Sequence, residues 1–107
     1  MDYLKIAKTI EFEEQNIRSY GLMGRRVAII RHSNGEYTAI EAGCKHQGVD
    51  LLTGTIVDMV ATCPCHQWQY DLLTGQCLNH DSAPLRKYSL RIEEGTILIS
   101  FLPVEND

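Results

Sequence analysis

Alternating apolar and polar residues predict short strands along most of this chain. Residues 27–31 form an apolar run rich in β-branched side chains, and the polar segment 33–36 follows them. That segment contains Asn34-Gly35, which is typical of a tight turn because both residue types tolerate a positive φ. Residues 37–40 then have the composition of a returning strand. We therefore expect an antiparallel hairpin here.

A second hairpin and a half-buried strand are predicted in the middle of the chain. Residues 55–57 and 60–62 are short apolar segments that flank a two-residue turn. Over residues 67–70, two glutamines alternate with two aromatic residues, which is typical of a strand with one buried face. A Thr-Gly pair at 74–75 then turns the chain.

Two more strands are predicted near the end of the chain, on either side of a turn at residues 93–95. Apolar residues occupy every second position, with Tyr88, Leu90 and Ile92 on one strand and Ile97, Ile99 and Phe101 on the other. Residues 9–15 alone favour a short helical turn, with Thr9 as its cap. The pattern predicts an all-β fold with a long excursion over residues 43–83.

The composition fits one small globular domain. The chain has 107 residues, of which 44% are hydrophobic and 22% are charged, and these values are ordinary for a globular protein. This length is enough for a hydrophobic core, so we expect residues 1–107 to form a single domain. The formal net charge of -4 offers no basic surface for nucleic acid, and no nucleic-acid partner is expected.

The N-terminal residues bear on the location of the protein. Residues 1–8 lack the apolar core of a signal peptide, and no apolar run approaches the length of a membrane span. We therefore expect a cytoplasmic protein without membrane association. The four cysteines would suggest disulfides in a secreted protein. Without a signal peptide, cysteines that bind a metal are the better interpretation.

Two short motifs in the excursion each combine cysteine with histidine. The first contains Cys44 and His46, residues 47–62 follow, and the second contains Cys63 and His66. Two thiolates and two imidazoles suit a Rieske 2Fe-2S cluster, in which one iron takes both thiolates and the other takes both imidazoles. Structural zinc is the alternative, although zinc sites usually space their cysteines as one pair and their histidines as another.

The residues around these motifs resemble the Rieske family. Residues 44–48 and 63–71 are similar to the two cluster-binding boxes of that family, and residues 71–75 and 83–88 are similar to its continuation. The resemblance extends over about residues 27–101. Either box alone would be a weak signal, whereas both boxes at this spacing are specific.

The resemblance implies a fold and a ligand set. The fold would be a small antiparallel β-sandwich of the Rieske type, with a loop-rich cluster-binding subdomain over about residues 43–83. Cys44 and Cys63 would bind the buried iron, and His46 and His66 would bind the outer iron. One 2Fe-2S cluster per chain is therefore expected.

Cysteines outside the ligand set are interpreted differently. In members of the family from membrane complexes, a cysteine at the position of Cys65 forms a disulfide with a cysteine at the position of Val49. The valine rules out this disulfide here. Cys77 is the other spare thiol, and we interpret it as a small buried packing residue. Gly48 is expected to let the first loop turn tightly.

Other residues near the boxes have two readings. Trp68 stands where high-potential members carry a serine that donates a hydrogen bond to a cluster sulfur, and we expect its indole to pack instead, which would lower the potential. Tyr70 could donate its hydroxyl or simply fill the core. Pro84 could stiffen a loop that covers the cluster or belong to an ordinary turn. His32 is expected to face solvent, and His80 is given no role.

The resemblance also implies a function. A cluster without an open coordination position transfers single electrons, and the chain lacks a Gly-rich nucleotide fingerprint, so no independent catalysis is expected. The implied protein is a soluble Rieske-type ferredoxin that carries electrons from a flavin-containing reductase to a terminal oxidoreductase such as an oxygenase. The alternatives are a small Rieske subunit of an NADH-dependent nitrite reductase-like complex and a zinc-stabilised β module that binds a partner.

Overall fold

The protein is built from short β-strands, which confirms the predicted all-β fold. The computed structural model describes residues 3–43, 50–64 and 67–103. Its elements in chain order are β1 (Tyr3–Lys8), the 3-10 turn η1 (Thr9–Phe12), β2 (Ile17–Leu22), β3 (Arg25–Arg31), β4 (Tyr37–Glu41), the 3-10 turn η2 (Leu51–Thr53), β5 (Thr55–Val57), β6 (Val60–Thr62), β7 (Gln69–Asp71), β8 (Lys87–Glu93) and β9 (Thr96–Pro103).

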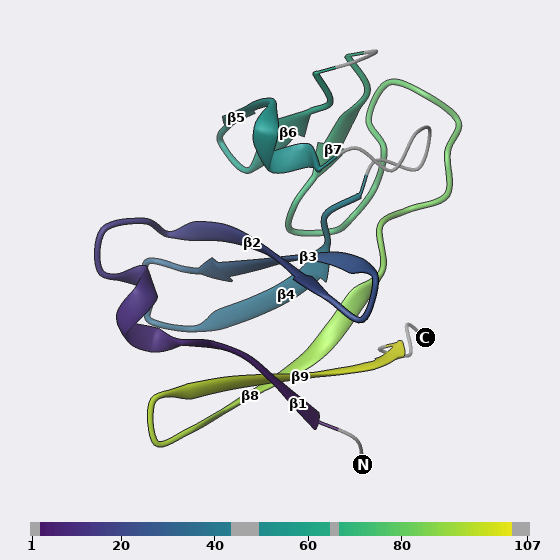
Figure 1. The fold of residues 1–107 in the computed structure, drawn as a ribbon. Helices are drawn as coiled ribbons and strands as arrows, with labels where there is room; N and C mark the ends of the chain where they lie inside the picture. Colours follow the sequence, from purple (N-terminus) through teal and green to yellow (C-terminus); the bar gives the residue numbers. More distant parts are fainter. Residues whose placement is uncertain (1–2, 44–49, 65–66, 104–107) are drawn as a thin grey trace.

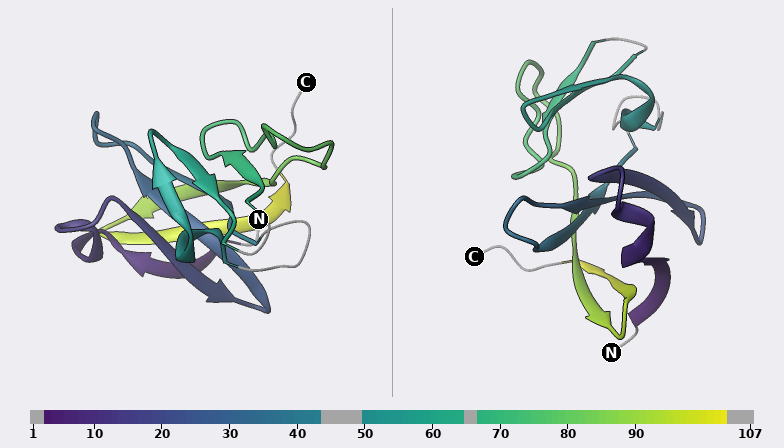
Figure 2. Two further views of the ribbon diagram at one scale, coloured as in Figure 1. Left: turned by 90° about the horizontal axis from the view of Figure 1, so that it is seen from above. Right: turned by 90° about the vertical axis from the view of Figure 1, so that its left-hand side faces the viewer.

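The strands form two antiparallel sheets (Figure 1). The larger sheet has the strand order β1-β9-β8-β4-β3-β2, and the smaller sheet has the order β5-β6-β7. The larger sheet folds over where β4 pairs with β8, through Ala39–Tyr88 and Ile40–Lys87. As a result, β2, β3 and β4 form one layer and β1, β8 and β9 form the facing layer of a sandwich. The smaller sheet lies on the outer side of the first layer (Figure 2).

β3 is buried on both of its faces. Its residues 27–30 are each at most 1% exposed, although successive side chains of a strand point in opposite directions. Val27 and Ile29 pack in the base core, which lies between the two layers and includes Phe12, Ala39, Tyr88, Ile97 and Ile99. Ala28 and Ile30 pack in the loop core, which lies under the smaller sheet and includes Ile40, Leu51, Ala61, Cys63, Tyr70, Leu72, Cys77 and Leu85.

Three of the hairpins turn through two residues that both have a positive φ, at Met23-Gly24, Asp58-Met59 and Glu94-Gly95. Such turns match the twist of the strands that they join. The predicted Asn34-Gly35 turn is a different type. Gly35 alone has a positive φ, of +90°, and its N–H donates to the His32 carbonyl oxygen at 2.9 Å. The loop therefore has three residues, closed by a hydrogen bond from His32 N–H to the Glu36 carbonyl oxygen at 2.7 Å.

The N-terminal part of the chain differs most from the prediction. β1 and β2 were not predicted, because most of their side chains are partly exposed and show no clear alternation. The short turn η1 is present, but Thr9 is its first residue and not its cap. Lys8 precedes the turn and donates its N–H to the Glu11 carboxylate at 3.0 Å. A carboxylate inside the turn therefore does the capping that was expected of a threonine hydroxyl.

Helices contribute little to this fold. In the part of the chain that the structure describes, no helix is long and apolar enough to cross a membrane.

Neighbouring isoleucines allow the two cores to be tested separately. Ile29→Val and Ile30→Val each remove one buried carbon, so each should lower the free energy of unfolding by about 0.5–1.5 kcal/mol. Because Ile29 packs in the base core and Ile30 in the loop core, I29V should accelerate amide hydrogen exchange in β9, and I30V should accelerate it in β6 and β7. Mass spectrometry of exchanged peptides measures both effects. The same exchange pattern in both variants would contradict the division into two cores.

Candidate metal centre

The excursion that carries both motifs leaves the larger sheet and returns to it at one place. Glu41, the last residue of β4, donates its backbone N–H to the Arg86 carbonyl oxygen at 2.7 Å. Arg86 directly precedes β8 and donates its N–H to the Glu41 carboxylate at 2.9 Å. The two ends of the excursion are therefore joined by hydrogen bonds in both directions.

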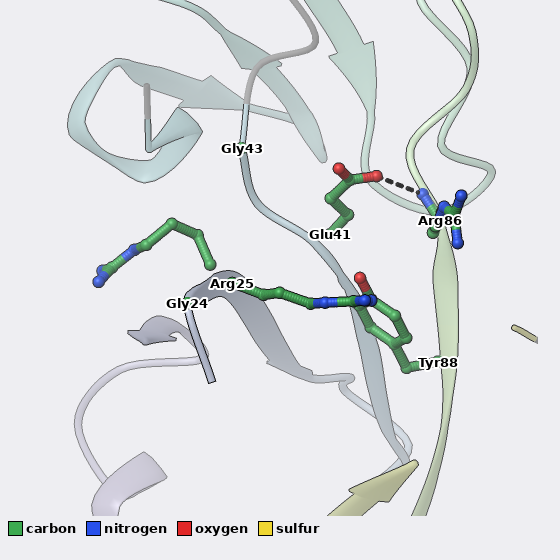
Figure 3. Close-up of a pocket in the computed structure, with 7 residues that line it drawn as sticks. Gly24, Arg25, Glu41, Gly43, Arg86 and Tyr88 are labelled. Atoms are coloured by element: carbon green, nitrogen blue, oxygen red, sulfur yellow. Dashed lines mark hydrogen bonds between the residues drawn. The ribbon is translucent and has the colours of Figure 1, made fainter. Parts of the chain in front are cut away.

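A pocket of about 410 Å³ opens beside this junction (Figure 3). Its lining includes Glu41 and Gly43 from one stem, Arg86 and Tyr88 from the other, and Arg25, which extends across the pocket toward Tyr88. The guanidinium of Arg25 also lies over the Phe101 ring, with its central carbon 4.9 Å from the ring centre. Charged side chains dominate this lining, which suits water and ions better than an apolar substrate.

Three of the four predicted ligands lie outside the described residues. The segments 44–49 and 65–66 are not described, and they contain Cys44, His46 and His66. The ligand assignment therefore stays a prediction, as do the expectations for Gly48, Val49 and Cys65. The described part of the site consists of Cys63 and the residues that flank both loops.

The first loop is closed at its base by backbone pairing. Gly43 and Asp50, on either side of it, form an antiparallel bridge. Leu51 donates its N–H to the Ala42 carbonyl oxygen at 2.8 Å, and this bond adds a second contact between the two ends. The described residues on either side of the predicted ligands Cys44 and His46 are thus paired with each other.

Asp50 ties the end of the first loop to the larger sheet. Its carboxylate accepts hydrogen bonds from the Leu52 N–H at 2.9 Å, from the Ser19 hydroxyl at 2.6 Å and from the Arg26 guanidinium at 2.9 Å. Burial raises the pKa of this carboxyl, but the three hydrogen bonds and the Arg26 charge outweigh burial and hold the pKa below its ordinary value. Sequence reasoning missed Asp50, although aspartate is a preferred residue before a helical turn.

The second loop stands on Cys63, which directly follows β6. Its side chain is fully buried in the loop core. Its N–H donates to the Trp68 carbonyl oxygen at 2.7 Å, and its own carbonyl oxygen accepts from the Gln67 N–H at 3.0 Å. These bonds hold the described residues on either side of the second loop together. Gln67 has a φ of 63°, which is uncommon for a residue other than glycine.

Gly54 lies at a close backbone contact beside the start of the second motif. It ends the η2 turn, which follows the first motif, and it lies against the residues that begin the second. A Cβ at this position would come within 2.0 Å of the Thr62 carbonyl oxygen and 3.0 Å of the Pro64 ring. Because real Cβ atoms do not approach backbone so closely, glycine is required for this contact. The segment that follows the first motif therefore lies against the residues that begin the second motif.

Aromatic residues pack beside the second loop. Trp68 stacks on His80, with ring centres 4.4 Å apart and an angle of 18° between the rings, and it also packs against the loop core. This confirms that the indole packs, and it gives His80 a contact that the sequence did not predict. Tyr70 is fully buried, and its hydroxyl lies 3.4 Å from the Ser82 hydroxyl. Strand β7 is thereby linked to the segment before Pro84.

The remaining predicted residues lie as follows. Cys77 is a thiol that packs in the loop core, as predicted. His32, which was expected to face solvent, is only partly exposed. Its Nε2 lies 2.8 Å from the Thr38 hydroxyl, so it belongs to the β3–β4 hairpin and not to the metal centre.

The described residues fit a metal-bound thiolate at Cys63. An ionised thiolate in an apolar core is unfavourable unless a metal or a positive group compensates its charge. The side chain of Cys63 is fully buried, and its backbone is held by hydrogen bonds. An ionised Cys63 would therefore need a compensating positive charge, and a bound iron would supply it. Thiolates suit iron-sulfur clusters, and the two Cys and two His of the motifs form the donor set of a Rieske cluster.

The chain belongs to the Rieske family. The model of the Rieske [2Fe-2S] domain matches its residues 2–89, a range that contains both motifs. Family membership confirms the predicted cofactor, a Rieske 2Fe-2S cluster, whose chemistry is the transfer of single electrons.

Three known proteins illustrate its relatives. The ferredoxin component of an alkene monooxygenase system from Xanthobacter autotrophicus is 25% identical over 108 residues, which cover 100% of this chain and 88% of that protein. One chain in a solved complex of oxygenase and ferredoxin in carbazole 1,9a-dioxygenase has a similar fold, with a TM-score of 0.78, 23% identity and 97% of each chain covered. A solved putative nitrite reductase small subunit has a TM-score of 0.71, 14% identity and coverage of 94% and 99%.

For some relatives, this chain matches only part of their length. It spans only 13% of an oxidoreductase from Pseudomonas putida and 59% of a methanesulfonate monooxygenase ferredoxin subunit from Methylosulfonomonas methylovora. The activities and partners of such whole proteins do not transfer to this chain by similarity alone.

We expect Asp50→Asn to loosen the first loop. The variant loses the charge that holds Ser19 and Arg26, so the free energy of unfolding near neutral pH should fall by about 1–3 kcal/mol. The pKa of the Asp50 carboxyl in the folded protein lies below its ordinary value. Asp50 therefore stabilises the fold fully at pH values above its ordinary pKa, and this contribution is lost as the pH falls through the lowered pKa.

Equilibrium unfolding of the wild type and D50N, near neutral pH and in strong acid, measures this effect. The difference between the two proteins should shrink in acid. Asp58→Asn, at the exposed turn between β5 and β6, is the matched control and should cause no comparable loss. A difference for D50N that does not depend on pH would show that the charge of Asp50 is not what holds the loop.

Proposed function

We propose that this chain is a one-electron carrier that receives electrons from a flavin-containing reductase and passes them to a terminal oxygenase. Membership of the Rieske family over residues 2–89 carries the proposal. Similarity over the full chain to the ferredoxin component of an alkene monooxygenase system supports it. The fold also resembles that of a ferredoxin solved in complex with its oxygenase.

The ligand assignment is part of this proposal. Cys44 and Cys63 would bind the buried iron, and His46 and His66 would bind the outer iron. The bound cluster supplies a reversible one-electron couple. The role of the polypeptide would be to exclude water from the thiolate side of the cluster and to keep both loops in place. The burial of Cys63 supports this role.

The two alternatives are less well supported. A small subunit of a nitrite reductase-like complex shares the fold, but the similarity over the full chain to a ferredoxin component favours the carrier. A zinc-stabilised binding module would use the same donor types, but family membership favours an iron-sulfur cluster.

The proposal extends to domain organisation and location. Residues 1–107 would act as one domain, because the base core and the loop core share strands β3 and β4. The cytoplasm is the proposed location, since it keeps thiols such as that of Cys77 reduced.

The ligand set leads to a direct prediction. The purified protein should be red-brown, with about two irons and two sulfides per chain. Replacing Cys44, His46, Cys63 or His66 by Ala should abolish the cluster, because each iron needs both of its protein ligands. Cys65→Ser is the matched control and should keep the cluster, since Val49 leaves it without the family's disulfide partner. Absorption spectra and iron analysis provide the measurement.

Two outcomes would contradict this assignment. A colourless protein with stoichiometric zinc would refute electron transfer altogether. Loss of the cluster in C65S, together with its retention in H46A, would refute the choice of ligands.

The packing of Trp68 leads to a prediction for the reduction potential. Hydrogen bonds to cluster sulfurs stabilise the reduced state, and Trp68 replaces the serine that donates one in high-potential members of the family. The midpoint should therefore lie in the lower part of the Rieske range of about -150 to +300 mV. Voltammetry at neutral pH measures it. Trp68→Ser should raise the midpoint and Trp68→Phe should not, and a wild-type midpoint well above zero would contradict the argument.

A further inference from the structure

A short segment after β7 lies against the second loop. Its first residue, Leu78, donates its N–H to the Gln69 carbonyl oxygen at 2.7 Å. Its last, His80, stacks on Trp68. Between them, the side chain of Asn79 is directed to the same stretch of backbone. The proposed electron transfer does not by itself assign a role to this segment.

The side-chain amide of Asn79 uses both of its polar groups on the loop. Its Oδ1 accepts a hydrogen bond from the Gln69 N–H at 3.0 Å, and its Nδ2 donates to the Gln67 carbonyl oxygen at 2.9 Å. These two bonds reach the residues on either side of Trp68, in the way that a neighbouring strand would pair with them. Alanine makes neither bond, and aspartate has no hydrogen to donate to the Gln67 carbonyl.

The backbone conformation of Gln67 depends on the hydrogen bond from Asn79. Its positive φ of 63° is sparsely populated in residues with a side chain, and such a conformation persists only where the surroundings determine it. Here the Cys63 carbonyl oxygen accepts its N–H at 3.0 Å, and Asn79 binds its carbonyl oxygen. Both backbone groups of Gln67 are therefore committed. Gln67 directly follows His66, so its conformation sets the direction in which the chain leaves that predicted ligand.

We propose that Asn79 is a positioning residue for the second ligand loop, which holds the backbone of Gln67 and Gln69 so that His66 is presented to the cluster. This inference rests on the proposed function, because the loop has a ligand to present only when the cluster binds. Residues that orient metal ligands from outside the coordination sphere typically change metal affinity or activity 10- to 100-fold. Asn79 is thus expected to govern how firmly the cluster is kept.

The test compares three variants with the cluster-loaded wild type. Asn79→Ala removes both hydrogen bonds, and Asn79→Asp can still accept from Gln69 but places an oxygen against the Gln67 carbonyl. Asn34→Ala is the matched control, because Asn34 also accepts a backbone N–H, that of Glu36 at 3.0 Å, in an exposed turn of the β3–β4 hairpin.

Four measurements are made on each protein. In N79A, iron should be lost to a chelator roughly tenfold faster, and amides of residues 67–69 should exchange hydrogen faster. The midpoint potential and the electron paramagnetic resonance spectrum of the reduced protein should also shift, which a general loss of stability would not cause. N79D should lose iron at least as fast as N79A, whereas N34A should match the wild type in every measurement.

The outcomes separate this inference from the proposed function. A wild-type protein that binds no cluster would overturn both. A wild type with its cluster, and an N79A variant that keeps iron and spectrum as well as N34A does, would overturn the role of Asn79 alone. His80→Ala adds a further check, because iron loss as fast as in N79A would assign the bracing to the stacked rings and refute the role of the amide.

Discussion

Four consecutive side chains of β3 are buried alternately on the two faces of the strand, and each face completes a different core. The smaller sheet has three strands of three residues each, and a sheet so short is not stable by itself. It becomes ordered because Ala28, Ile30 and Ile40 offer it an apolar surface that the larger sheet already holds in place. The smaller sheet is therefore supported by side chains that belong to another layer of the fold.

Burial alone does not orient a loop, because the hydrophobic effect has no direction. Hydrogen bonds supply the direction, and this chain uses polar side chains for them at the base of each ligand loop. Asp50 joins the first loop to the larger sheet through Ser19 and Arg26. Asn79 joins the second loop to a segment of its own subdomain. Asp50, at the end of the first loop, is thus held to the sandwich, and Gln67, at the end of the second, is held within the subdomain of the smaller sheet.

The sequence predicted those features that depend on local patterns. The hairpins over residues 27–40 and 88–101 followed from alternation and turn residues, and the two boxes followed from their resemblance to a family. β2 was missed because it is an edge strand with mixed exposure. Asp50 and Asn79 were missed because their roles depend on partners that only the fold brings near: Ser19 is 31 positions from Asp50, and Gln67 is 12 positions from Asn79.

The hydrogen bonds between Glu41 and Arg86 make the excursion an insertion between two neighbouring strands of a complete sandwich. Because its ends start side by side, its length can change without a shift in the pairing of β4 with β8, and loop closure adds little to the entropic cost. Such a segment can be exchanged between related sandwiches as one unit. The recipient would need small and β-branched side chains where Ala28, Ile30 and Ile40 lie. It would also need partners for Asp50 where Ser19 and Arg26 lie.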